Sequence, residues 1–149
     1  MKHTCLAFHR DDRGAALIEM ALTLPLMLLV SAGIFEFGRA YQTWQIITNA
    51  AREGARMAVL PGTTDSDVRT RVQTYMTDGM LTAAATATVN IDRSATVAVG
   101  AGTESASRIT VNYPFTFVVM QPIARLVAPA SNVGKPLTMT VSALMRNEQ

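Results

Sequence analysis

The chain has 149 residues, of which 49% are hydrophobic and only 16% charged, and its formal net charge is +2. This length suits one domain of ordinary size, and the high apolar content argues against a disordered chain. The 13 lysines and arginines are scattered along the sequence, which disfavours binding of nucleic acid through a basic patch. A single cysteine excludes a disulfide framework.

The surplus of apolar residues lies near the N-terminus. Residues 15–35 read AALIEMALTLPLMLLVSAGIF and contain one charged side chain, Glu19. A helix of this length can span the hydrocarbon core of a bilayer, which is roughly 30 Å thick. Because Lys2, Arg10 and Arg13 precede the segment, the positive-inside rule predicts a cytoplasmic N-terminus and a C-terminal domain outside the inner membrane.

The helix is expected to continue beyond the apolar segment. Small and apolar residues recur there at alternating spacings of four and three, which places them along one seam of a long helix. The seam residues are Gly33, Phe37, Ala40, Trp44, Ile47, Ala51, Gly54 and Ala58. The residues assigned mostly to the other faces are Glu36, Arg39, Gln42, Gln45, Asn49, Arg52, Glu53 and Arg56. Pro61-Gly62 is a strong turn signal and should end the helix.

The rest of the chain predicts a small α+β domain. Thr64 is a candidate N-cap for a short helix that ends at Gly79. Alternating sequences then predict an antiparallel sheet of about four strands. The expected strands are 88–91, 96–99, 108–113 and 137–145, with a loop over 122–136 that includes a turn of helix near 123–127. Pro114 should interrupt the third strand or place it on an edge.

The start of the apolar segment resembles a known processing signal. The run RGAALIE, residues 13–19, is similar to the site at which a membrane peptidase cleaves type IV prepilins of the tight-adherence class after the glycine. Pro25 and the runs EFGR (36–39) and NAAREGAR (49–56) resemble the TadE-like family of minor pilins, or pseudopilins, and VNYPF (111–115) is a weaker match. Met20 stands where major prepilins of this class usually carry tyrosine, which favours a minor component.

The resemblance implies an organisation and a function. Residues 1–14 would be a cytoplasmic leader, 15–60 a long helix (15–35 membrane-spanning, 36–60 amphipathic) and 61–149 an exterior domain. The protein would be a minor pilin of a tight-adherence (Flp) type IV pilus, which serves adhesion and biofilm formation. Its partners would be the inner membrane, a prepilin peptidase, other pilins and minor pilins, and the assembly machinery. Neither a cofactor nor a metal is expected.

Site residues follow from this resemblance and from the helix pattern. They are the processing residues Gly14 and Ala15, the carboxylate Glu19, and the packing or assembly residues Pro25, Glu36, Gly38, Arg39, Asn49, Arg52, Glu53, Gly54 and Arg56. Glu19 is costly inside a bilayer and is expected to pair with an amine, either that of Ala15 in its own chain or that of a neighbouring subunit, where the pair would set the register of a filament. Snorkelling toward the headgroups is the simpler alternative.

Several alternatives remain open at this stage. Val30-Ser31-Ala32 also satisfies the small-residue rule of a conventional signal peptidase, which would release a domain starting at Gly33. The exterior domain could instead be a membrane-tethered binding module that joins no filament. Pro25 could be an ordinary membrane-helix proline. Arg52 and Glu53 could anchor the sheet or a neighbouring subunit, or Arg52 and Arg56 could form a solvated face.

An enzyme is not expected. No histidine or cysteine follows residue 9, so the exterior domain lacks the groups for histidine-dependent triads and thiol catalysis. His3, Cys5 and His9 could suggest a metal cluster by residue type alone. All three lie in the expected leader, which favours coincidence.

Overall fold

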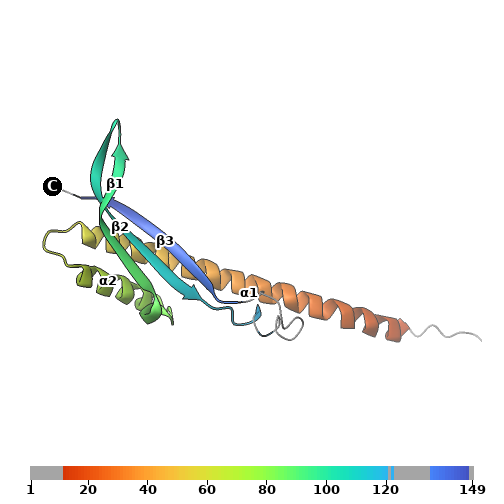
Figure 1. The fold of residues 1–149 in the computed structure, drawn as a ribbon. Coiled ribbons are helices and arrows are strands. Elements are labelled where there is room, and N and C mark those ends of the chain that lie inside the picture. Colours follow the sequence, from red (N-terminus) through yellow and green to blue (C-terminus); the bar gives the residue numbers. More distant parts are fainter. Residues whose placement is uncertain (1–11, 121, 123–134, 148–149) are drawn as a thin grey trace, which may run out of the picture. The chain divides into compact units, whose positions relative to one another are not determined.

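The computed structural model describes residues 12–120, 122 and 135–147 of the chain (Figure 1). The chain divides into two compact units, Met1–Phe35 and Glu36–Gln149, and helix α1 (Asp12–Ala58) passes from the first into the second. The expected loop and helical turn between residues 122 and 136 lie largely outside the described residues, as do the three leader residues His3, Cys5 and His9.

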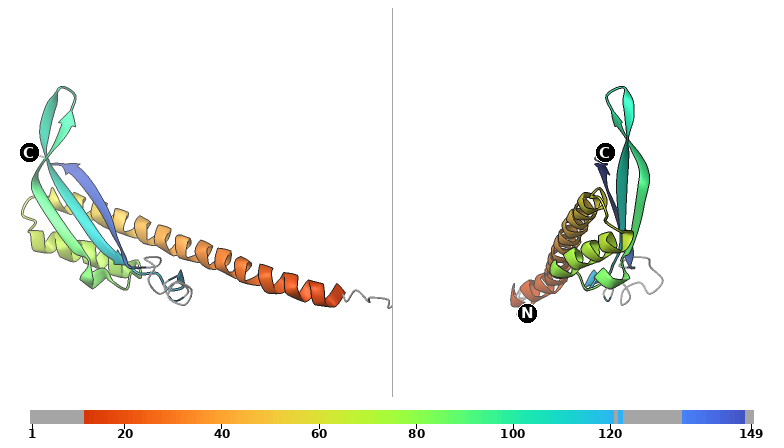
Figure 2. Two further views of the ribbon diagram at one scale, coloured as in Figure 1. Left: turned by 45° about the vertical axis from the view of Figure 1, so that its right-hand side comes forward. Right: turned by 90° about the vertical axis from the view of Figure 1, so that its left-hand side faces the viewer.

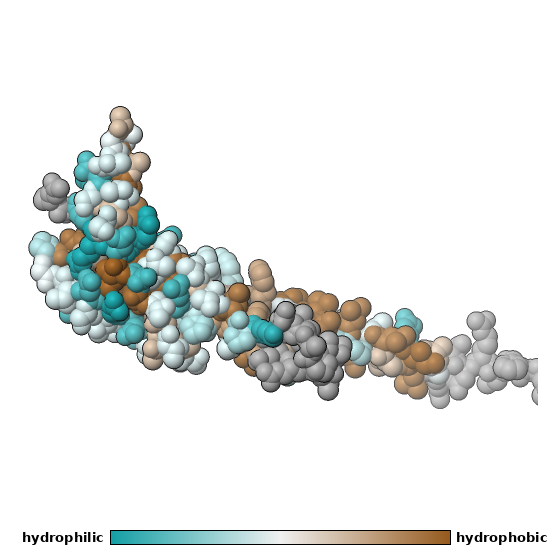
Figure 3. Space-filling view, in the orientation of Figure 1, coloured by the Kyte–Doolittle hydropathy of each residue, from teal (hydrophilic) through white to brown (hydrophobic). Residues whose placement is uncertain are grey.

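In the first unit, α1 presents its apolar side chains outward. Leu17 and Leu22 are 69% and 73% exposed, and hydrophobic side chains predominate along the first part of α1 (Figure 3). The Ser31 hydroxyl donates to the carbonyl of Met27 at 2.9 Å, so this polar group is satisfied within the helix. The helix containing this segment is long and apolar enough to cross a membrane, judged by length and composition.

The second unit is an α+β domain of two layers. After α1 come α2 (Asp65–Asp78), the short 3-10 helix η1 (Ala84–Thr86) and the strands β1 (Thr88–Val99), β2 (Gly102–Phe115) and β3 (Leu137–Arg146). The strands form one antiparallel sheet in the order β1-β2-β3. Helix α2 and the second part of α1 lie on the same face of this sheet (Figure 2). The predicted α+β class and antiparallel sheet are therefore confirmed.

The sheet has three strands where about four were predicted. The runs expected as separate strands at 88–91 and 96–99 form the single strand β1, whose pairing with β2 shifts register between Asp92 and Ala95. An irregularity of this kind interrupts the alternation of side chains without ending the strand. The Asp92 carboxylate occupies the bulge and accepts hydrogen bonds from the backbone N–H and the hydroxyl of Ser94, which lower its pKa.

Pro114 does not interrupt its strand. It lies within β2 opposite Thr138 of β3, two residues beyond Asn112, where pairing with β1 ends. At this position β2 has only one neighbouring strand, so the proline lies locally at an edge, as the second of the two predicted alternatives requires.

The core lies between the helices and the inner face of the sheet. Val89, Val111 and Val141 occupy one row across the three strands, and each is buried. The helices cover this row with small residues of α1 and with Val68, Val72 and Met76 of α2. The opposite face of the sheet is polar; there the Thr140 hydroxyl donates to Asn112 at 2.8 Å.

Helix α2 begins at the predicted N-cap. The Thr64 hydroxyl accepts a hydrogen bond from the backbone N–H of Asp67, and the Asp67 carboxylate accepts bonds from the backbone N–H and hydroxyl of Thr64. These hydrogen bonds, the side-chain one first, lower the pKa of Asp67. The reciprocal pair is a capping box, which satisfies donors that the first turn of a helix leaves free.

Candidate functional site

Glu36 is the first residue of the second unit and the most deeply buried charged side chain described by the structure. It was assigned to an outer face of the helix, and this was wrong: Glu36 is 1% exposed. Its Oε1 accepts hydrogen bonds from the backbone N–H groups of Val118 (2.6 Å) and Val119. Its Oε2 accepts one from Nη1 of Arg39 at 2.9 Å. A buried carboxylate is retained at this position because three donors replace its hydration.

Arg39 completes this arrangement, which we call the Glu36 clamp (Glu36, Arg39 and the backbone N–H groups of Val118 and Val119). The Arg39 side chain is 33% exposed, and its guanidinium lies 5.1 Å from the centre of the Phe115 ring. Its Nη2 also donates to the carbonyl of Thr116 at 3.4 Å. The clamp thus fixes the segment that follows β2 against the first turns of α1 in this unit.

The predicted seam is partly wrong at its N-terminal end. Phe37 and Trp44 of the seam are 75% and 44% exposed, so this end of the seam does not pack inside the second unit. The buried face contains Glu36 and Thr43, and it includes the seam residues Ala40, which is partly buried against the core, and Ile47. A polar residue can hold a buried position when its hydrogen bonds are made internally, and the hydropathy pattern contains no information on such partners.

Gly54 lies where α1 crosses α2 and the sheet. A Cβ atom at this position would lie 2.5 Å from Cγ2 of Val72 and 3.4 Å from Cγ2 of Ile109. The glycine therefore permits a close approach inside the subunit. Gly38 differs, because a Cβ there would meet no atom within 4 Å.

The charged residues of the 49–56 run divide into two groups. Glu53 accepts two hydrogen bonds from Arg71 of α2, so it anchors α2 rather than the sheet. Asn49, Arg52 and Arg56 are exposed on α1, with Nη1 of Arg52 at 3.5 Å from Oδ1 of Asn49. These three side chains are available to a partner.

The remaining predicted site residues lie in the first unit. Pro25 lies inside α1 without ending it, and Glu19 is exposed on the same helix. Gly14 and Ala15 are in the first turn of α1 as described. The structure places these residues on one helix.

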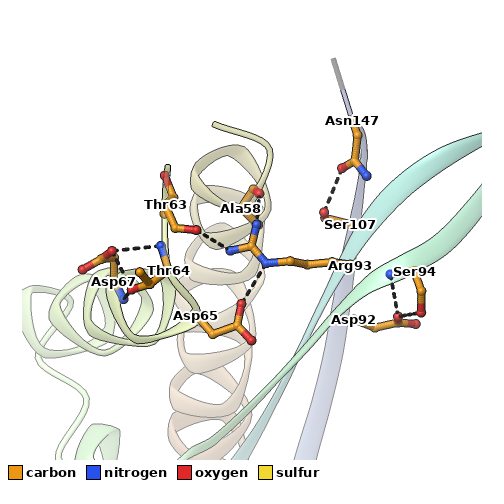
Figure 4. Close-up of polar contacts among 10 residues, drawn as sticks. All are labelled: Ala58, Thr63, Thr64, Asp65, Asp67, Asp92, Arg93, Ser94, Ser107 and Asn147. Carbon is orange, nitrogen blue, oxygen red and sulfur yellow. Dashed lines mark hydrogen bonds and ion pairs between the residues drawn. The ribbon is translucent and has the colours of Figure 1, made fainter. Parts of the chain in front are cut away.

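Arg93 is a structural residue that the sequence analysis missed. It lies in the bulge of β1 and donates to the carbonyls of Ala58 (2.7 Å) and Thr63 (2.9 Å) and to the Asp65 carboxylate at 2.8 Å (Figure 4). It therefore satisfies the last carbonyl of α1 and fixes the turn into α2. The interruption of alternation between residues 92 and 95 was the available signal, since bulges redirect a side chain.

Replacing Arg93 with methionine is expected to lower the free energy of unfolding by about 1–3 kcal/mol. Methionine keeps most of the length of the side chain but leaves two carbonyls without their donor. Arg93→Lys should lose less, because one amine can reach one or two of the three acceptors. Denaturant unfolding of the detergent-solubilised chain checks this, with exposed Arg69→Met on α2 as the control. Equal effects at positions 93 and 69 would contradict the proposed role.

An open groove of about 420 Å³ lies beside the clamp. Its lining includes Arg39 and Gln42 of α1, Met80 and Ala83 after α2, and Tyr113 of β2. The Tyr113 hydroxyl accepts a hydrogen bond from the backbone N–H of Ala83 at 3.2 Å. Within the described ranges, no three acidic, histidine or cysteine side chains gather to hold a metal, and every buried side-chain polar atom has a partner.

The architecture is that of an α+β domain preceded by an N-terminal helix that is long and apolar enough to cross a membrane. A comparison with protein families matches residues 14–56 to the family described as TadE-like protein. The match confirms the resemblance predicted from the sequence over this segment and associates the segment with the Tad pilus. No curated protein and no solved structure gives a match to the chain.

Proposed function

We propose that the protein is a minor pilin or pseudopilin of a tight-adherence pilus, processed after Gly14 by a prepilin peptidase. The observation that carries the proposal is the family match over residues 14–56, a segment that begins at the processing glycine and contains the whole apolar run. The exposure of that run supports it, because an apolar helix without a partner in its own chain needs lipid or other helices around it.

The proposed topology places the N-terminus in the cytoplasm and the second unit outside the inner membrane. The support is the distribution of Lys2, Arg10 and Arg13 before the apolar segment. Cleavage after Gly14 would remove these three residues and leave the amine of Ala15 one helical turn from Glu19. In a filament, that amine on a neighbouring subunit would pair with Glu19. An unpaired charge is penalised in a core of low dielectric, so the pair would select one axial register.

The second unit would contribute assembly contacts through the exposed residues of α1. Asn49, Arg52 and Arg56 lie on or near its solvent-facing side within or at the end of the family match. Glu36, Glu53 and Gly54 are engaged inside the subunit, so their effect on assembly would be indirect. Substitutions of the exposed residues are therefore expected to impair assembly, whereas substitutions of the residues engaged inside the subunit are expected to impair folding.

Processing is tested by determining the mature N-terminus. We expect a chain that begins at Ala15, and we expect Gly14→Phe to leave the leader attached because the peptidase must admit the backbone at a small residue. The matched variant Ala32→Phe alters the site at which a conventional signal peptidase would cleave, and it should leave the mature N-terminus unchanged. The pilin assignment would be refuted if the mature chain begins at Gly33 and if Ala32→Phe prevents that cleavage.

Assembly is tested by deleting the gene and restoring it with variants. We expect pili to be lost on deletion, restored by the natural chain, and reduced by the double variant Arg52→Ala/Arg56→Ala although that protein remains folded. Intact pili and unchanged adhesion in the deletion strain would refute an assembly role and favour a tethered binding module.

A further inference from the structure

In the segment that follows β2, Phe117 packs against the core, but apolar side chains remain partly exposed. Residues 116–120 read TFVVM, and Val118 is 58% exposed. Phe117, Val119 and Met120 are partly exposed, and Phe117 packs edge-on against Phe115 with ring centres 5.3 Å apart. The exposed parts of these four consecutive apolar residues form a surface of the kind that partners or membranes cover.

The Glu36 clamp fixes the height of this segment along α1. Val118 and Val119 are bonded to Glu36, and Glu36 directly follows Phe35, the last residue of the apolar run, in one continuous helix. The rise from one helical residue to the next is about 1.5 Å. The segment 117–120 is therefore attached to α1 at the residue that directly follows the apolar run.

An exposed aromatic side chain of α1 close to the end of the apolar run fits a membrane surface. Phe37 is 75% exposed and follows Phe35 by about 3 Å along the helix. The interfacial zone of a bilayer is roughly 5–7 Å thick on each side, and aromatic residues concentrate there.

The charge of Glu36, which directly follows the apolar run, is neutralised internally. A free carboxylate one residue beyond the hydrocarbon would oppose close contact with lipid, but Glu36 is 1% exposed and is paired with Arg39 and two backbone N–H groups. Arg39 keeps a third of its side chain exposed, which suits a cation at the level of lipid phosphates.

We propose that Phe117–Met120, together with Phe37, forms an interfacial foot that inserts into the boundary between headgroups and acyl chains of the bilayer. The foot rests on the proposed function, because it requires residues 15–35 to span the membrane. It gives the exterior domain a second attachment and so restricts its orientation on the surface. Extraction of the subunit from lipid would then require release of both the helix and the foot.

The experiment uses single-tryptophan variants, which the chain permits because Trp44 is its one tryptophan. In a Trp44→Phe background, tryptophan replaces Val118 in the foot, Phe37 on α1, Leu24 in the apolar run, or Val99, which is 46% exposed in the hairpin of β1 and β2. Each full-length variant is placed in nanodiscs of phosphatidylcholine and phosphatidylglycerol. Quenching is measured with lipids brominated near the headgroup and, separately, with aqueous acrylamide.

We expect Val118→Trp and Phe37→Trp to be quenched by the brominated lipids several-fold more strongly than Val99→Trp, with the reverse order for acrylamide. Equal lipid quenching at positions 118 and 99, with strong lipid quenching at 24, would overturn the foot and leave membrane insertion intact. Weak lipid quenching at 24 would overturn insertion and the foot together. Protection of position 118 from both quenchers would show that protein covers it, which also overturns contact with lipid.

Discussion

Replacing Glu36 with alanine is expected to lower the free energy of unfolding of the second unit by about 2–4 kcal/mol. The substitution leaves the N–H groups of Val118 and Val119 and one guanidinium N–H of Arg39 without their acceptor. Buried donors that lose a charged acceptor lose the strongest kind of hydrogen bond, and only those that reach water recover part of it. Urea unfolding of the detergent-solubilised chain, followed by circular dichroism, measures the change.

The matched control is Glu53→Ala on the same helix. Glu53 is also paired with an arginine at 2.9 Å, but the two side chains are 30% and 49% exposed. An exposed pair of this kind contributes less than about 1 kcal/mol, since water solvates both partners when they separate. Equal losses for Glu36→Ala and Glu53→Ala would show that burial of the clamp carries no special weight, and would remove the structural basis for holding residues 117–120 at a fixed level.

The contrast between Glu36 and Phe37 shows what a hydropathy pattern can and cannot predict. The helix, its end near Pro61, the N-cap Thr64 and the antiparallel sheet follow from local chemistry and periodicity, and all are present. The pattern placed Phe37 on the apolar seam and Glu36 on another face of the helix, whereas in the structure Glu36 is buried and Phe37 is exposed. The pattern fails at Glu36 because the hydrogen-bond donors of this side chain, Val118 and Val119, are more than 80 positions away in sequence.

Arg93 was missed for a related reason. Its three acceptors come from the end of α1, the following turn and the start of α2, so its role exists only once the bulge of β1 lies beside that turn. Sequence spacing can indicate that a strand is irregular near residues 92–94. It cannot indicate where the redirected side chain will point, because that depends on the packing of helices against the sheet.

In the second unit, the residues of the family-matched segment fall into two groups according to whether they face inward or outward. Inward-facing residues of α1, such as Glu36 and Gly54, are explained by contacts in this subunit. Outward-facing residues, such as Gly38 and Arg52, have no comparable explanation among the described contacts. A resemblance by sequence treats both groups alike, whereas substitutions should separate them by whether folding or assembly fails first.

Gly54→Ala is expected to destabilise the second unit by about 1–3 kcal/mol. The new methyl group would lie 2.5 Å from Cγ2 of Val72, which is 0% exposed and packed between α1, α2 and the sheet, so neither the side chain nor the helices can move aside freely. Alanine is favoured over glycine in a helix by about 0.5–1 kcal/mol, and this gain offsets only part of the overlap. Urea unfolding in detergent again gives the measurement.

Gly38→Ala on the same helix isolates the packing effect, because the propensity gain is the same while no atom lies within 4 Å of the new methyl group. It should raise the free energy of unfolding by about 0.5–1 kcal/mol. A stabilised Gly54→Ala would contradict the close approach of α1 and α2. If Gly38→Ala is more stable than the natural chain and yet reduces piliation, the glycine must serve a helix of another subunit, since a loss of assembly accompanied by a gain in stability cannot come from misfolding.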